Sequence, residues 1–106
     1  MGVPYDWALV DFEKGEQSSE RFLSINPNGR IPALIDRARG VTVAESGAIL
    51  EYSAARFASP LLPPAHEDLQ LHLQTKQWLH WQVSALGPSM GQAMYFQRIA
   101  KVRGHN

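Results

Sequence analysis

The pattern of hydrophobic and polar positions in the first third of the chain predicts a short strand followed by a short helix. Residues 5–12 contain several β-forming residues and run into a charged cluster, which is typical of one strand that ends in a loop. Ser18 can then cap a short helix that ends near residue 25. The sequence Asn26-Pro27-Asn28-Gly29 combines a restricted residue before proline with a flexible glycine, so we expect a turn there.

The next apolar positions predict a hairpin and a second helix. Residues 31–35 and 41–43 form two apolar runs, and the loop between them carries Gly40, which favours two antiparallel strands. Beyond Ser46 the apolar residues recur at helical spacing as far as Phe57, and Ser46 itself is suited to be the N-cap. The predicted order is therefore strand, helix, strand, strand, helix.

The second half of the chain is predicted to be helical. Residues 58–66 contain Pro60, Pro63 and Pro64, so this segment cannot continue a helix and is expected to form a semi-rigid connector. Residues 65–86 hold no glycine or proline and are too many for one strand, which indicates a long helix. The pair Gly87-Pro88 is expected to kink or interrupt that helix before it resumes near residue 90.

Composition excludes several classes of function. The 106 residues are 44% hydrophobic and 19% charged, which is typical of one small globular domain or of part of a larger one. Ten Lys and Arg balance ten Asp and Glu, so there is no basic excess for a nucleic-acid partner. The chain has no cysteine, and its four histidines lack the spacing of metal ligands, so no metal site is predicted. No apolar run resembles a membrane span or a secretory signal, so we expect a cytoplasmic protein without a membrane partner.

Several ordered motifs resemble one known family. The two most specific motifs are Asn26-Pro27-Asn28-Gly29-Arg30-Ile31-Pro32-Ala33-Leu34 and Glu45-Ser46-Gly47-Ala48-Ile49-Leu50-Glu51-Tyr52. They are supported by residues 11–17 before them and by residues 77–82 and 86–88 after them. Together this set resembles the glutathione S-transferases, and within them the bacterial nu-class branch, which is close to the yeast prion-related transferases. The similarity extends over nearly all 106 residues.

The resemblance implies an α/β fold that is incomplete relative to the family. It predicts a partial thioredoxin-like N-terminal domain, without the family's first strand and helix, followed by the first helix or two of an all-α C-terminal domain. The expected domains are a glutathione-binding part at residues 1–57, a proline-rich linker at 58–66 and the start of the helical domain at 67–106. The chain is then a fragment, has a start codon assigned too late, or is completed by another chain.

The resemblance also implies a glutathione site. In the family the proline that matches Pro32 follows a cis bond, and the backbone of the residue that matches Ile31 pairs with the cysteinyl part of glutathione like an added strand. Glu45 and Ser46, at a helix start, then supply the acceptor and the donors for the ammonium and carboxylate of the γ-glutamyl end. Gln17 is implied as a further contact. Alone, Pro32 reads as an ordinary strand-edge proline and Glu45-Ser46 as a helix start.

No catalytic residue can be assigned from this sequence, and whether the chain is an enzyme stays open. In this branch a Thr or Asn on a loop before the matching segment activates the glutathione thiol, and no residue here matches that position. The strand that the family has and this sequence lacks lies between residues 5–12 and the strand near Ile31. We therefore expect a gap in the sheet and exposed apolar surface on the long helix.

Three hypotheses for the function follow. The leading one is a glutathione transferase-like protein, acting as a homodimer, that uses glutathione as co-substrate to attack a small electrophile or to reduce a disulfide. The second is a non-catalytic glutathione-binding or dimerisation module of the same fold, inactive because the activating loop is absent. The third is a small interaction module that shares only the hairpin and the helix, and the combined motifs at Ile31-Pro32 and Glu45-Ser46 argue against it.

Overall fold

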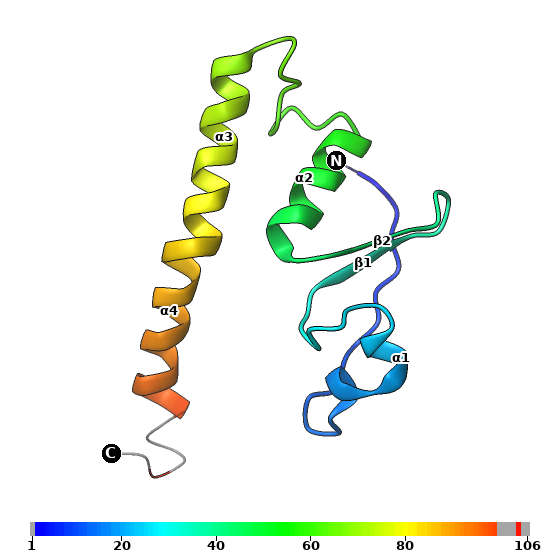
Figure 1. Cartoon of the computed structure of the whole chain (residues 1–106), viewed down its shortest axis with the longest axis vertical. Helices are drawn as coiled ribbons and strands as arrows, with labels where there is room; N and C mark the ends of the chain where they lie inside the picture. The colour runs from blue at the N-terminus through cyan, green and yellow to red at the C-terminus, as the bar shows by residue number, and fades with distance from the viewer. Residues whose placement is uncertain (1, 100–103, 105–106) are drawn as a thin grey trace. The chain divides into compact units, whose positions relative to one another are not determined.

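The computed structural model describes residues 2–99 and residue 104. The chain divides into two compact units, Met1–Pro63 and Pro64–Asn106. The first unit contains α1 (Glu20–Leu23), the strands β1 (Ala33–Asp36) and β2 (Val41–Ala44), and α2 (Ser46–Arg56) (Figure 1). The second unit contains α3 (Leu69–Trp81) and α4 (Gly87–Met94).

The predicted hairpin is confirmed. Strands β1 and β2 are antiparallel, with Ala33 opposite Ala44 and Asp36 opposite Val41. The loop between them contains Gly40 at φ 65°, a left-handed conformation that glycine adopts without a steric penalty. The chain therefore enters β1 and leaves β2 at the same end of the ladder, and this end positions the candidate site.

Helix α2 is joined to the hairpin by a polar cluster centred on Asp36. The Tyr52 hydroxyl donates a hydrogen bond of 2.7 Å to Asp36 Oδ2, and Arg56 Nε lies 3.5 Å from the same oxygen. The hydrogen bond from Tyr52 is the main cause that holds the pKa of the Asp36 carboxyl below its usual value, and the same bond raises the pKa of Tyr52. Close by on α2, Ala54 is the buried apolar side chain of the described residues.

This cluster predicts an acid-sensitive fold. Because the pKa of Asp36 is lowered in the folded state, its ionised form stabilises the fold above the ordinary aspartate pKa of about 3.9. That contribution is lost as the pH falls through the folded-state pKa. Tyr52→Phe removes the main cause of the shift, so we expect the variant to show a lower urea midpoint at neutral pH and a smaller loss on acidification.

The measurement is urea unfolding of the parent and of Tyr52→Phe across the acidic range. Tyr5→Phe is the matched control, because Tyr5 is 83% exposed and the same hydroxyl is removed. Identical acid dependence of the parent and Tyr52→Phe would show that Tyr52 does not set the pKa of Asp36.

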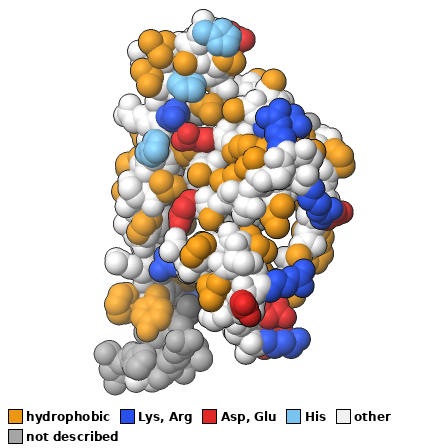
Figure 2. Space-filling model, turned by 45° about the vertical axis from the view of Figure 1, so that its right-hand side comes forward, with side chains coloured by type: hydrophobic (Ala, Val, Ile, Leu, Met, Phe, Trp, Pro, Cys, Tyr) orange, Lys and Arg blue, Asp and Glu red, His pale blue; other side chains and the backbone are white. Residues whose placement is uncertain are grey.

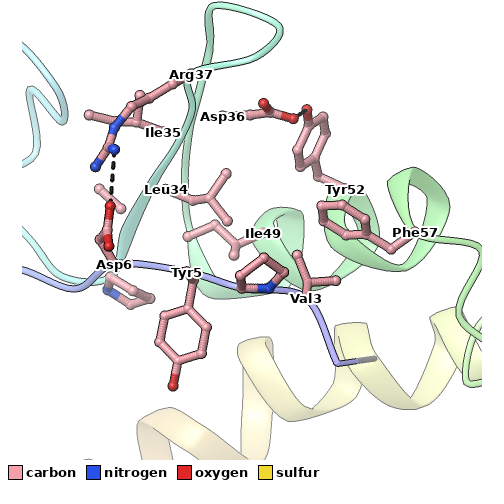
Figure 3. A pocket seen from close by; sticks show the side chains of 13 residues that line it. Val3, Tyr5, Asp6, Leu34, Ile35, Asp36, Arg37, Ile49, Tyr52 and Phe57 are labelled. Atoms are coloured by element: carbon pink, nitrogen blue, oxygen red, sulfur yellow. Dashed lines mark hydrogen bonds and ion pairs between the residues drawn. The ribbon is translucent and has the colours of Figure 1, made fainter.

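The predicted strand over residues 5–12 is wrong, because residues 2–11 form no ladder in the structure. A strand exists through hydrogen bonds to a neighbouring strand, and the described sheet consists of β1 and β2 only. A groove of about 670 Å³ lies instead between residues 3–6 and residues 32–37 (Figure 3). This groove is where the family resemblance places an additional strand.

The groove has an apolar interior and a polar end. Figure 3 shows Leu34 and Ile49 at its centre and Val3 and Phe57 beside them. An ion pair of 3.0 Å between Arg37 and Asp6 joins its two walls. Both side chains of this pair are more than three-quarters exposed, so its contribution to stability is expected to be small, below about 1 kcal/mol.

Three helix starts differ from the prediction. Residues 16–18 form a short 3-10 turn, so the cap of α1 is Ser19 rather than Ser18, and Ser19 Oγ accepts a hydrogen bond of 3.2 Å from the Phe22 amide. The N-cap of α2 is Glu45 rather than Ser46, which is the first residue of the helix. Helix α3 begins at Leu69 rather than near residue 65, because the Asp68 carboxylate accepts from the Leu71 amide at 2.9 Å and caps it there.

The long helix of the second unit is interrupted as predicted, although the interruption precedes Gly87. A π-helical turn, Gln82–Leu86, separates α3 from α4. Pro88 lies in the first turn of α4, where a missing N–H is tolerated. Among residues 2–99 and 104, no helix is long and apolar enough to cross a membrane.

The expected apolar surface is present on the second unit. Trp78 and Trp81 are 62% and 46% exposed and pack edge to face against each other, with ring centroids 5.6 Å apart. Figure 2 shows hydrophobic side chains distributed over the visible surface of the molecule. This exposure leaves both indole rings of the second unit accessible for contacts.

Candidate ligand-binding site

The two halves of the predicted site lie next to each other at one end of the hairpin. The Ile31-Pro32 bond is cis, as the resemblance predicts. Because Ala33 pairs with Ala44, Pro32 and Glu45 are the next residues on the two strands beyond the ladder. Opposite residues in an antiparallel pair have Cα atoms about 4.5–5.5 Å apart, so the segments 31–32 and 45–46 begin from neighbouring positions at this end of the ladder. All four residues are exposed.

Glu45 has an unusual backbone conformation. Its φ is 70° and its ψ is 122°, although it is not a glycine. Such a conformation costs roughly 1–3 kcal/mol and is found preferentially at functional positions. The Glu45 side chain makes no capping hydrogen bond to the helix that follows. Its exposed carboxylate is therefore not committed to capping α2 and can accept hydrogen bonds from a ligand.

The start of α2 provides donors beside that carboxylate. The Glu45 carbonyl accepts the first bond of the helix, from the Ile49 amide at 2.9 Å. The amides of the first helical residues, beginning with Ser46, have no partner within the helix, and they carry the positive end of the helix dipole. An anionic acceptor thus lies next to a group of N–H donors. This arrangement suits a ligand whose ammonium and carboxylate are adjacent, which is the chemistry of an amino-acid head.

Gln17 lies against the loop that leads into Ile31. A Cβ placed on Gly29 would be 3.0 Å from the Gln17 carbonyl oxygen, so these two backbones are in close contact. The Gln17 Oε1 atom is buried and has no hydrogen-bond partner among the described residues. The structure therefore places Gln17 next to the segment that precedes Ile31. Its side-chain oxygen is able to accept a hydrogen bond.

The structural role of one residue of this region was not predicted from the sequence. Asn26 is 2% exposed, and its side chain donates to the Arg30 carbonyl at 2.6 Å. Its Oδ1 accepts from the Asn28 amide at 3.1 Å. Asparagine commonly bonds to the backbone two residues ahead, so the contact with Asn28 could have been foreseen. The contact with Arg30 depends on how the loop closes, and the sequence gives no signal for it.

The groove beside β1 and the candidate site are different places. The groove includes Pro32, but its lining does not include Gln17, Ile31, Glu45 or Ser46. Within residues 2–99 and 104, no three His, Cys, Asp or Glu side chains gather to hold a metal ion, and His105 lies outside the described residues. The groups that the candidate site offers are backbone groups, one carboxylate and a helix start.

The fold and these features define a thioredoxin-like domain of the kind that forms the N-terminal part of glutathione S-transferases. Residues 1–55 match the family model described as the glutathione S-transferase N-terminal domain, and the chain belongs to this family. Among curated relatives it is 38% identical over 102 residues to the protein URE2 of Candida glabrata, covering 92% of this chain and 28% of that protein. It is 35% identical over 98 residues to the glutathione S-transferase-like protein gedE of Aspergillus terreus, covering 92% of this chain and 42% of gedE.

Solved structures show the same fold. The glutathione transferase URE2P6 of Phanerochaete chrysosporium, in complex with oxidized glutathione, superposes with a TM-score of 0.82 at 38% identity, covering 92% of this chain and 44% of that one. A glutathione transferase of Burkholderia graminis, with two glutathione molecules bound per subunit, gives 0.83 at 37% identity, covering 92% and 40%. The chain thus spans less than half the length of these proteins.

Proposed function

We propose that this chain binds glutathione at the end of the hairpin, as part of a glutathione transferase. The observation that carries the proposal is the strand register, which brings Ile31-Pro32 beside Glu45-Ser46. Further support comes from solved relatives with the same fold and 37–38% identity that contain bound glutathione. In this arrangement the tripeptide lies along Ile31 and its γ-glutamyl head reaches the start of α2.

Two parts of glutathione have chemically matched partners in the proposed complex. The peptide backbone of the cysteinyl residue pairs with the Ile31 backbone, as in strand addition. The ammonium of the γ-glutamyl end donates to the Glu45 carboxylate, and its carboxylate accepts from Ser46 and the helix amides. Hydrogen bonds to charged groups contribute about 1.5–3 kcal/mol each, so the head group supplies much of the affinity. Gln17 is proposed as an additional polar contact.

We further propose that the full-length protein uses glutathione as a co-substrate. The glutathione sulfur attacks a small electrophile, so that a carbon–sulfur bond forms as a leaving group departs, or it attacks a disulfide, so that a mixed disulfide forms as one thiol is released. We propose that it does so as a cytoplasmic homodimer, since the chain lacks cysteine and exposes Trp78 and Trp81 on one helix. We assign no thiol-activating residue within residues 2–99.

A second function is favoured by one observation. The proposed pose uses Glu45 and Ser46 to hold the γ-glutamyl head and the Ile31 backbone to hold the cysteinyl backbone, so none of these groups is assigned to the thiol. A non-catalytic glutathione-binding or dimerisation module of the same fold is therefore the alternative. The relative in Saccharomyces cerevisiae, 37% identical over 102 residues, is named a transcriptional regulator. Turnover of a chlorinated aromatic test substrate with glutathione would support the transferase, and binding of glutathione without turnover would support the non-catalytic module.

Calorimetric titration of the purified chain with reduced glutathione tests the proposed site. We expect saturable binding with one molecule per chain. Cysteinylglycine is the control ligand, because it lacks the γ-glutamyl head, and we expect it to bind at least about tenfold more weakly, equal to about 1.4 kcal/mol. Equal affinity for both ligands would remove the head-group assignment, and no binding of glutathione would refute the proposed function of this chain.

A further inference from the structure

We infer that Asn26 is a positioning residue that turns the Ile31 amide toward the ligand. The side chain of Asn26 donates from Nδ2 to the Arg30 carbonyl oxygen at 2.6 Å. That carbonyl and the Ile31 N–H belong to the same peptide unit. This inference rests on the proposed function, because it assigns a cause to the orientation of the backbone group that is proposed to bind glutathione.

The geometry of the peptide bond transmits the effect. A peptide unit is planar, and in the trans form its C=O and N–H point in opposite directions. Ile31-Pro32 is the cis bond identified in the described backbone, so the Arg30–Ile31 unit is trans. Asn26 is 2% exposed and holds the Arg30 carbonyl toward the interior of the loop. The Ile31 N–H consequently points the opposite way, on a residue that is 52% exposed.

Asn26 is fixed from several sides, so it can serve as a rigid anchor. Its side-chain Oδ1 accepts a hydrogen bond from the Asn28 backbone amide at 3.1 Å. Its backbone N–H donates to the Phe22 carbonyl at 2.9 Å, and its backbone carbonyl accepts from the Gly29 amide at 2.9 Å. The side chain must donate and accept at the same time, which the amide of asparagine does. An unsatisfied polar group at so buried a position is costly, and the packing therefore selects this arrangement.

Asn26→Asp tests the inference through its pH dependence. The substitution keeps the shape and the acceptor for Asn28 but places a carboxylate oxygen against the Arg30 carbonyl. The ionised carboxylate repels that carbonyl, whereas the protonated acid donates to it and restores the bond. Burial raises the pKa of the introduced carboxyl above the ordinary value of about 3.9. We therefore expect glutathione affinity about tenfold below the parent near neutral pH, with the ratio to the parent recovering toward one as the pH falls.

Asn28→Asp is the matched control, because it introduces the same charge two residues away on an exposed side chain. Its affinity ratio to the parent should stay near one at every pH. Taking the ratio cancels the titration of glutathione and of other groups on the protein. A residue that only stabilised the fold would lower the affinity by the same factor at every pH at which the variant stays folded.

A second readout works without ligand and keeps the inference separate from the proposed function. The NMR signal of the Ile31 amide, recorded without glutathione, should move with pH in Asn26→Asp and stay fixed in Asn28→Asp. Asn26→Ser, which is uncharged and too short to reach the Arg30 carbonyl, should displace the same signal at all pH values. If the parent does not bind glutathione, the proposed function fails, and the amide signal still decides the role of Asn26.

Three results would overturn the inference. The first is an Ile31 amide signal that is unchanged in both Asn26 variants. The second is a binding ratio for Asn26→Asp that is independent of pH while circular dichroism shows a folded protein. The third is unfolding of both variants at every pH, which would identify Asn26 as a residue of the fold alone.

Discussion

Glu45→Gln is expected to weaken glutathione binding by one to two orders of magnitude. The substitution keeps the size of the side chain and the backbone at φ 70°, but it removes the negative charge that faces the ligand ammonium in the proposed complex. A hydrogen bond to a charged group contributes about 1.5–3 kcal/mol, and about 1.4 kcal/mol corresponds to a tenfold change in affinity. The dissociation constant from calorimetry measures the effect directly.

The control for this prediction is Glu13→Gln. Glu13 is exposed and lies before the 3-10 turn, so the variant has the same change in net charge at a position outside the proposed site. We expect it to bind like the parent. If Glu45→Gln and Glu13→Gln bind equally well, Glu45 does not contact the ligand and the proposed pose of the head group is wrong. Equal urea midpoints for both variants would show that the loss arises in binding rather than in folding.

The elements that were predicted correctly are those with a local signal. The hairpin follows from two apolar runs around a loop with Gly40, and α2 follows from a helical repeat that continues to its end at Arg56. The strand predicted at residues 5–12 is absent because it depends on a non-local partner. Its composition favours extended backbone, but a ladder requires hydrogen bonds to another strand, and the described sheet provides none for that segment.

The residue types of the candidate site follow from the sequence, whereas their arrangement does not. The ordered motifs single out Ile31-Pro32 and Glu45-Ser46, but only the register shows that these segments begin from neighbouring positions. No sequence signal indicates the positive φ of Glu45, because non-glycine residues adopt it rarely. The hydrogen bond between Asp36 and Tyr52 spans 16 residues and depends on how α2 docks on β1, so local patterns could not reveal it.

Gly29→Ala is expected to be the most destabilising single substitution near the site. Gly29 has φ 62°, where a Cβ costs about 1–2 kcal/mol, and the added Cβ would also lie 3.0 Å from the Gln17 carbonyl oxygen. That oxygen is a backbone atom and cannot move without shifting the 3-10 turn. Overpacking of this kind adds roughly 1–3 kcal/mol.

Gly40→Ala separates these two effects, because Gly40 has nearly the same φ, 65°, and nothing lies within 4 Å of its added Cβ. We expect Gly40→Ala to lower the free energy of unfolding only by the cost of a Cβ at positive φ. We expect Gly29→Ala to lower it by that cost together with the cost of the clash with Gln17. Urea unfolding of both variants measures the difference in free energy. Equal losses of unfolding free energy in the two variants would show that the loop before Ile31 does not press against Gln17. The structural argument for including Gln17 in the proposed site would then fail.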